Sequence, residues 1–143
     1  MKLDIPLIRL TENKNQDFQL EGEGKLGLIL VCNKADLLDG GKEKALEIAK
    51  AVGYDFPKDL AILSTDAASL NLSEALESIS YKSVISFHFS AEALGLPAHL
   101  VEYHPYVFEQ MTLVLSDAIQ NIKNDNDKKK KLWNAVKTLK PTA

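Results

Sequence analysis

The feature that most constrains the fold is an alternation, from Leu26 onward, between short apolar runs and segments with helical periodicity. Each run is bounded by polar or turn-forming residues, which is typical of strands covered on both faces. Strands separated by helical segments favour an α/β fold: an open, mostly parallel sheet with right-handed crossovers and helices on both faces. We predict a sheet of four strands, at residues 28–32, 60–63, 83–89 and 99–103.

Helical periodicity fills the segments between these strands. Apolar residues recur at helical spacing over 45–52, where Asp39 and the pair Gly40-Gly41 supply cap and turn chemistry and Gly53 closes the segment. The remaining predictions are short helices at 71–79 and 91–94, a loop or short extended piece at 106–115, a helix capped by Ser116 and Asp117, a break at 124–127, and a final helix to about Leu139.

The first 25 residues differ from this regular pattern. Pro6 interrupts an apolar run at residues 5–10, and proline cannot donate to a sheet ladder, so this run is predicted to be an extended or edge segment. Residues 11–24 are polar and glycine-containing, which indicates a connector or an exposed hairpin. We therefore divide the chain into an arm and polar connector, 1–25, and a single α/β domain, 26–143, that ends in a basic amphipathic helix.

Composition excludes several classes of protein. The net charge is −3, from 17 basic and 20 acidic residues, so direct nucleic-acid binding is expected to be weak or absent. The single cysteine, Cys32, can form no intrachain disulfide, and no basic-then-apolar leader follows Met1, which indicates a cytoplasmic protein. The longest apolar stretch, 26–32, is far shorter than the roughly 20 residues of a membrane-spanning helix.

Polar residues follow the predicted strands, and the carboxyl ends of parallel strands are where open sheets usually bind ligands. The most specific motif is Asn33-Lys34-Ala35-Asp36, because guanine-nucleotide proteins place Asn-Lys-x-Asp after a buried strand and bind the base with its carboxylate. Triphosphate binding also needs a G-x-x-x-x-G-K-[ST] loop, which no segment supplies. An alternative ligand site comprises Asn33, Asp36, Asp66 and His88, although such residues also cap helices and close loops in any α/β domain.

Histidine and cysteine spacing predicts no metal or nucleophilic site. His88, His99 and His104 match no common zinc pattern, and Cys32 has no second thiol. Packing as a small apolar residue in the first strand is the favoured role of Cys32. We therefore expect no metal and no cofactor, and we favour a non-enzymatic role over a catalytic one.

The last predicted helix carries the run Lys128-Lys129-Lys130-Lys131 beside an apolar stripe. Consecutive helical residues point in different directions, so the four lysines cannot all contact one phosphate track. The stripe contains Leu132, Trp133, Val136 and Leu139. It fits either a solvated cationic surface with a tryptophan in the core, or a surface that docks a protein or weakly binds nucleic acid.

Two separated segments together resemble the psi subunit of the bacterial DNA polymerase III holoenzyme, an accessory protein of the clamp-loader complex. Leu28-Ile29-Leu30-Val31-Cys32-Asn33-Lys34-Ala35-Asp36-Leu37-Leu38-Asp39, with the helix and strand after it, is similar to that family's first strand, Asn-containing loop, helix and second strand. Leu115-Ser116-Asp117-Ala118-Ile119, then Lys131-Leu132-Trp133-Asn134-Ala135-Val136-Lys137, resembles its C-terminal pattern, a leucine-aspartate segment before a helix bearing Leu-Trp.

This resemblance implies a non-catalytic adaptor whose α/β domain is related in shape to uracil-DNA glycosylases but lacks their catalytic residues. In the family, an extended N-terminal arm engages the clamp-loader body, and the α/β domain binds the chi subunit, which contacts single-strand-binding protein. The implied partners are therefore clamp-loader subunits and a chi-like protein. Carried over by position, the partner-binding candidates on the arm are Ile5, Leu7, Ile8 and Leu10, with Trp133 as a further candidate on the last helix.

Other interpretations stay open. The arm fits an extra edge strand packed on the domain as well as a tether that orders on a partner. A small α/β enzyme or nucleotide-binding domain, with its site at the carboxyl ends of the strands, is the alternative to an adaptor. A nucleic-acid-associated protein that acts through residues 128–131 is the third possibility.

Overall fold

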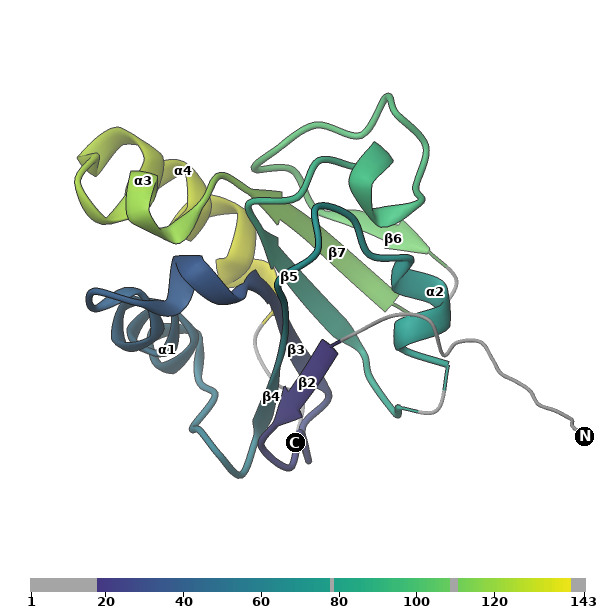
Figure 1. Cartoon of the computed structure of the whole chain (residues 1–143). Coiled ribbons are helices and arrows are strands. Elements are labelled where there is room, and N and C mark those ends of the chain that lie inside the picture. Colours follow the sequence, from purple (N-terminus) through teal and green to yellow (C-terminus); the bar gives the residue numbers. More distant parts are fainter. Residues whose placement is uncertain (1–17, 78, 109–110, 140–143) are drawn as a thin grey trace, which may run out of the picture.

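The computed structural model describes residues 18–77, 79–108 and 111–139. Its strands are β2 (Phe18–Glu21), β3 (Leu28–Asn33), β4 (Leu60–Thr65), β5 (Ser83–Phe87), β6 (Tyr106–Phe108) and β7 (Met111–Ser116). They form one six-stranded sheet in the order β2-β4-β3-β5-β7-β6 (Figure 1).

The sheet is mixed. Its central strands β4, β3, β5 and β7 are parallel, while β2 and β6 are antiparallel edges. The predicted α/β class with a mostly parallel sheet is therefore confirmed. The predicted number of four strands is wrong, because the described residues alone form six. The strand β2 lies within the segment predicted as a polar connector or an exposed hairpin, and four of the described residues there pair with β4.

The fourth parallel strand is β7, and the predicted strand at 99–103 is wrong. Tyr103 has a left-handed φ of 63° and Val101 is 57% exposed, so that segment belongs to a loop. Residues 106–115, predicted as a loop or a short extended piece, contribute β6 and most of β7. The two strands follow each other without a Gly, Pro or Asn turn signal between them, which hides the hairpin in the sequence.

Helices cover both faces of the sheet, as predicted (Figure 1). One face, which we call the helical face, packs against α1 (Gly41–Val52), α3 (Ile119–Lys123) and α4 (Asn126–Val136), with the 3-10 turns η1 (Lys34–Leu37) and η3 (Lys137–Leu139) beside them. The other, the loop face, packs against α2 (Leu72–Ala75), η2 (Glu92–Leu94) and neighbouring loops.

Alternate side chains of each strand point to opposite faces and so supply two separate cores. Because both faces are covered, the parallel strands are continuous apolar runs rather than alternating ones. The strand residues of the helical face are Leu28, Leu30, Cys32, Leu60, Ile62, Ile85, Phe87 and Val114, and those of the loop face are Ile29, Val31, Ala61, Leu63, Val84, Leu113 and Leu115.

The helix α1 shows how sequence periodicity builds the helical face. Ala45, Ala49 and Val52 are buried at positions i, i+4 and i+7. Gly53 ends the helix in a left-handed conformation, and its N–H donates to the Ala49 carbonyl. The helix begins without a side-chain cap, so the predicted capping role of Asp39 is wrong.

The two C-terminal helices lie where the sequence predicts them. Asp125 separates them and caps α4, since its carboxylate accepts hydrogen bonds from the N–H groups of Asp127 and Lys128 at 3.0 and 3.1 Å. The sequence predicted that Ser116 and Asp117 cap α3, and this is wrong. The N-cap position is Ala118, which has no side chain that can accept a hydrogen bond. The start of α3 therefore needs an acceptor from elsewhere in the chain.

Candidate functional site

The carboxyl ends of the parallel strands bring three of the four alternative ligand residues to one edge of the sheet. Asn33 ends β3, Asp66 follows β4 and His88 follows β5. The chain passes from β3 outward to β4 and then returns across β3 to form β5, so strand order reverses between β3 and β5. Open α/β sheets bind ligands at such a reversal, which makes this edge the first place to examine.

Asn33 and Asp66 make contacts within the fold. The Asn33 Oδ1 accepts a hydrogen bond from the Ala35 N–H at 3.0 Å and so caps η1. The Asp66 Oδ2 lies 3.8 Å from the Lys34 Nζ, and the Asp66 side chain is 79% exposed. An ion pair this open to water contributes little to stability, so Asp66 is a solvated carboxylate.

Asp36 is buried, and its carboxylate contacts α3. Its Oδ2 accepts a hydrogen bond from the Ile119 N–H at 2.6 Å, and its Oδ1 accepts one from the Gln120 N–H at 3.0 Å. These N–H groups belong to the first turn of α3, where a carboxylate satisfies unpaired donors and offsets the helix dipole. Asp36 is therefore the missing cap of α3, supplied from 83 residues earlier in the chain.

Further hydrogen bonds join the same two segments. The Gln120 Nε2 donates to the carbonyl oxygens of Asp36, at 3.2 Å, and Leu38, at 2.6 Å. The Lys123 Nζ donates to the carbonyl oxygen of Asp39. We call this set of contacts, between residues 36–41 and 119–123, the latch.

The latch depends on a glycine. A Cβ at Gly41 would lie 1.9 Å from the Asp36 carbonyl oxygen and 2.9 Å from the Gln120 Nε2. Any side chain at this position would therefore push the Asp36 loop away from α1. The predicted turn chemistry at Gly40-Gly41 has its physical reason here, in the close approach of two backbones.

This arrangement gives Asn33-Lys34-Ala35-Asp36 a structural role. A guanine site needs the aspartate carboxylate to face the base, whereas both Asp36 oxygens here face backbone N–H groups of α3. Sequence reasoning did not identify Ile119 and Gln120 as the partners of Asp36, because no local pattern links residues so far apart. The sequence carried no signal for this contact, because Ser116 and Asp117 offered a local cap and the start of α3 after Ala118 is known only from the structure.

His88 lies beside a cavity at the carboxyl end of β5. It is exposed and has a left-handed φ of 80°. Its backbone N–H donates a hydrogen bond to the Ser116 carbonyl oxygen at 3.1 Å. Its ring meets the Phe89 ring edge-on, at 5.2 Å between centroids. The cavity has a volume of about 350 Å³, and the residues around it include His88, Ser90, Glu92, Leu100, Glu102 and Leu115.

The four alternative ligand residues are therefore not gathered in one cavity. Neither Asn33 nor Asp66 lines the cavity beside His88, and Asp36 is committed to the latch. Two carboxylates, from Glu92 and Glu102, are the polar groups that the structure adds there. Sequence reasoning missed both, because Glu92 lay in the short helix predicted at 91–94 and Glu102 lay in the strand wrongly predicted at 99–103.

The described part of the chain shows neither a metal-binding cluster nor a reactive thiol. Across those residues, no three His, Cys, Asp or Glu side chains gather closely enough to hold a metal ion. Cys32 is fully buried in the helical face, and burial, with a smaller effect from the Asp36 charge, raises the pKa of its thiol well above the ordinary value. The thiol therefore stays protonated and acts as a core residue.

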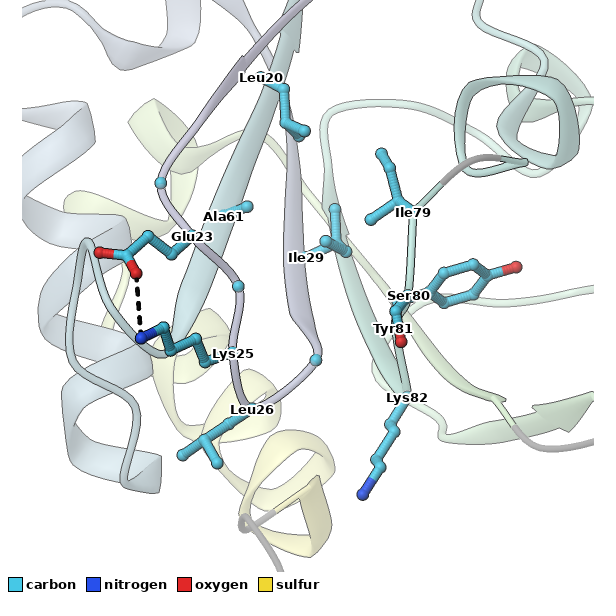
Figure 2. Close-up of a pocket in the computed structure, with 13 residues that line it drawn as sticks. Leu20, Glu23, Lys25, Leu26, Ile29, Ala61, Ile79, Ser80, Tyr81 and Lys82 are labelled. Atoms are coloured by element: carbon cyan, nitrogen blue, oxygen red, sulfur yellow. Dashed lines mark ion pairs between the residues drawn. The ribbon is translucent and has the colours of Figure 1, made fainter.

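Another cavity, of about 310 Å³, lies at the amino ends of β3 and β4 (Figure 2). Figure 2 shows residues 22–27 on one side of it and residues 79–82 on the other, with the side chains of Ile29 and Ile79 between them. Glu23 and Lys25 form an ion pair at 3.4 Å on the first of these walls. The cavity therefore has an apolar centre and charged margins.

The glycines of this wall suggest a phosphate-binding loop, but its amides are already engaged. The N–H groups of residues 23–26 donate to the carbonyl oxygens of residues 57–60, and the Gly27 N–H donates to the Gly24 carbonyl. Phosphate loops need several N–H groups free to point at the anion. The loop instead fastens the start of β3 to the segment that leads into β4.

A groove of about 140 Å³ lies between α1 and α4. Ile48 and Ala51 of α1, with Leu132 and Trp133 of α4, supply its apolar surface. Trp133, one of the predicted partner-binding residues, is 39% exposed, whereas Leu132 and Val136 of the same stripe are buried. Sequence reasoning missed the α1 side of the groove, because the spacing of Ile48 is that of a core residue.

The four consecutive lysines have different environments. The Lys128 Nζ lies 2.5 Å from the Asp117 Oδ2, Lys129 lines the groove, and Lys130 and Lys131 are exposed. Burial raises the pKa of Asp117, but hydrogen bonds from Lys128, Asn121 and the Ala118 N–H outweigh it, so the pKa is lowered overall. The run is thus a structural ion pair followed by three lysines that form no ion pair within the described residues.

Ile5, Leu7, Ile8 and Leu10 lie outside the described residues, so their role as partner anchors stays a prediction. In the part of the chain that the structure covers, no helix combines the length and apolarity needed to cross a lipid bilayer. No protein-family model matches the chain, and no curated protein matches it.

Proposed function

We propose that this protein is a non-catalytic adaptor in DNA replication that resembles the psi subunit and links a clamp-loader complex to a second protein. Its partners in this proposal are clamp-loader subunits and a chi-like protein, and its compartment is the cytoplasm. Any polymerase activity belongs to the assembly that it joins. The protein acts by contact, with neither a cofactor nor a covalent step.

The latch is the observation that carries this proposal. The resemblance rests on residues 28–39 and on residues 115–119 and 131–137, and the latch joins the first segment to the beginning of the last part of the chain. Asp36 of the first segment accepts a hydrogen bond from the Ile119 N–H of the second. The segments that carry the resemblance therefore pack together in one fold, as the proposal requires.

The character of the exposed surface also supports an adaptor. Trp133 is partly exposed over an apolar groove, and interfaces draw most of their binding energy from a few such aromatic side chains. At the strand ends, by contrast, Asn33 and Asp36 are hydrogen-bonded within the fold. The exposed residue best suited to bind a partner is therefore the apolar side chain of Trp133, and not a polar residue at the strand ends.

The direct test is binding of the purified full chain to clamp-loader subunits from its own organism, followed by size-exclusion chromatography. The proposal predicts a stable complex that elutes ahead of either component. The proposal is refuted if none of the clamp-loader subunits forms a complex with the chain.

A deletion of residues 1–12 tests the arm within the same assay. If the arm is a tether, the shortened chain loses the complex and keeps the melting temperature of the full chain. If the arm is an extra edge strand, the melting temperature falls. The deletion removes both the apolar side chains and the segment that carries them. A full-length variant with serine in place of Ile5, Leu7, Ile8 and Leu10 removes the side chains alone.

The cavity beside His88 favours a second candidate, a small-molecule-binding α/β domain. Its volume of about 350 Å³ is at the lower end of ligand pockets, and Glu92, Glu102 and His88 supply polar groups around it. Such a domain would bind a small polar ligand there. Thermal-shift screening of nucleotides and metabolites, repeated on His88→Ala and Glu102→Gln, distinguishes the two candidates, since an adaptor gives no shift that depends on these residues.

A further inference from the structure

The groove lies between α1 and α4, and both of these helices pack against α3. α3 also carries residues of the latch. Ile48 of α1 and Leu132 of α4 both line the groove, as does Trp133, which is 39% exposed. The latch therefore positions an apolar surface that the described residues leave partly uncovered.

The size of the groove indicates what it can hold. A volume of about 140 Å³ is well below the roughly 300 Å³ at which small-molecule pockets begin, so a drug-sized ligand has too little space. One bulky apolar side chain from another polypeptide fits this volume. Interface hot spots have this form, with a side chain of one protein seated in a small apolar pocket of the other.

The charges around the groove define the rest of the occupant. Lys44 and Lys129 line it together with one carboxylate, Glu47, which the Lys44 Nζ binds at 2.9 Å and which the Lys129 charge stabilises to a smaller extent. Lys129 and the exposed Lys130 have no ion-pair partner in the described part of the chain. A segment that seats here meets a surplus of positive charge at its margins.

We propose that this groove binds an acidic peptide segment of a partner protein, which inserts one leucine or aromatic side chain against Trp133 and places carboxylates beside Lys129 and Lys130. This inference deepens the proposed function, because it assigns a binding surface and a partner chemistry to an adaptor. Nucleic acid is a poorer occupant: Lys128 is paired with Asp117, Lys129 faces the groove, and the chain as a whole is acidic.

The chain contains a single tryptophan, so its fluorescence reports directly on the groove. A random dodecapeptide library displayed on phage is selected against the immobilised full chain, and the enriched peptides are synthesised with a fluorescent label. We expect enriched peptides with a net negative charge and at least one leucine or aromatic residue. Their binding shifts the Trp133 emission to shorter wavelength and weakens as salt is added.

Variants locate the binding surface. We expect Trp133→Ala to weaken peptide binding, measured by anisotropy, by about tenfold or more. Lys129→Glu weakens peptide binding several-fold. Lys129 makes no ion pair in the described residues, so we expect this variant to change the melting temperature only slightly, and it tests the groove even if Trp133→Ala lowers stability. Lys131→Glu, a charge reversal of the same size on the same helix, points away from the groove by helical spacing and leaves binding unchanged.

Several outcomes overturn the inference. These are failure to enrich any peptide, enrichment of basic peptides, or binding that is equally strong with Trp133→Ala and Lys129→Glu. An oligothymidine strand that displaces the peptides would assign the groove to nucleic acid. A dimer in sedimentation that Trp133→Ala dissociates would assign it to a second copy of the chain.

Failure of this inference is distinguishable from failure of the proposed function. If clamp-loader subunits bind Trp133→Ala and Lys129→Glu as tightly as the native chain, the adaptor stands and the groove is not its docking surface. If acidic peptides bind the groove and no clamp-loader subunit binds the chain, the groove stands and the replication role fails.

Discussion

The two faces of the sheet use alternate residues of the same strands, yet they are covered in different ways. The helical face packs against α1, α3 and α4. The latch joins α3 to the loop that leads into α1, through hydrogen bonds that the Asp36 carboxylate accepts and the Gln120 side chain donates. The loop face packs against one turn of α2, the short η2 and loops. An equally apolar sheet surface can thus be covered by regular helices or by irregular chain. The difference should appear in how much stability each face loses when a core residue is substituted.

The largest expected effect comes from a matched pair of phenylalanines. Phe87 lies in the core of the helical face and Phe89 in that of the loop face, at 0% and 3% exposure. We expect Phe87→Ala to lower the free energy of unfolding by about 4 kcal/mol and Phe89→Ala by about 3 kcal/mol, because loops close around a cavity more easily than packed helices. Urea denaturation measures both, and a larger loss for Phe89→Ala would reverse the comparison.

The next effect concerns two adjacent glycines at the start of α1. Gly41→Ala places a Cβ against the Asp36 carbonyl oxygen, and we expect a loss of about 3 kcal/mol. Gly40→Ala meets no atom nearer than 3.9 Å but has a φ of 83°, and we expect about 1 kcal/mol. Thermal unfolding compares them. An equal or greater loss for Gly40→Ala would show that backbone strain, and not the close approach at the latch, limits this turn.

A smaller effect distinguishes a remote cap from a local one. Asp36→Ala removes the acceptor of two α3 N–H groups, so we expect a loss of about 2 kcal/mol. Asn71 caps α2 on the loop face through the Glu74 N–H at 3.0 Å, and we expect Asn71→Ala to cost about 1 kcal/mol. Hydrogen exchange of the Ile119 and Gln120 amides, accelerated only in Asp36→Ala, shows that the loss originates at the latch.

The smallest effect is a pH dependence at the edge of the helical face. The pKa of Asp117 is lowered in the folded protein, so its contribution is complete above the ordinary carboxyl pKa of about 4 and is lost as the pH falls through the lowered value. We therefore expect the native chain to lose more stability than Asp117→Asn as the pH falls below about 4. Parallel curves of melting temperature against pH for the two proteins would contradict this expectation.

The contrast between the faces also explains what sequence could predict. The helices of the helical face were located correctly because their apolar residues repeat at 3.6-residue spacing, as Ala45, Ala49 and Val52 do. The loop face has little periodicity: Leu100 is buried there by a loop, and its apolar neighbours imitated a strand. β6 and β7 were missed because no turn residue marks the hairpin between them.

The candidate site was less predictable than the fold. Local patterns predicted where the first three parallel strands end, and parallel pairing then places Asn33, Asp66 and His88 at one edge of the sheet. The hydrogen bond of Asp36 to α3 joins residues 83 positions apart in the chain. The groove likewise forms only because residues of α1 and α4 come together in the fold. Both are products of tertiary packing, which a single sequence does not encode in any local spacing.

The latch also has a consequence for synthesis on the ribosome. β3 is the centre of the sheet and leaves the ribosome early, yet the strand and helices that complete its helical face come from residues 111–139. Domains fold as units during translation, so a nascent chain that ends before β7 exposes Leu30 and Cys32 to water or to a chaperone. The helical face therefore closes only after residue 139 has emerged, and a stop codon between residues 111 and 139 should leave an aggregation-prone product rather than a smaller stable one.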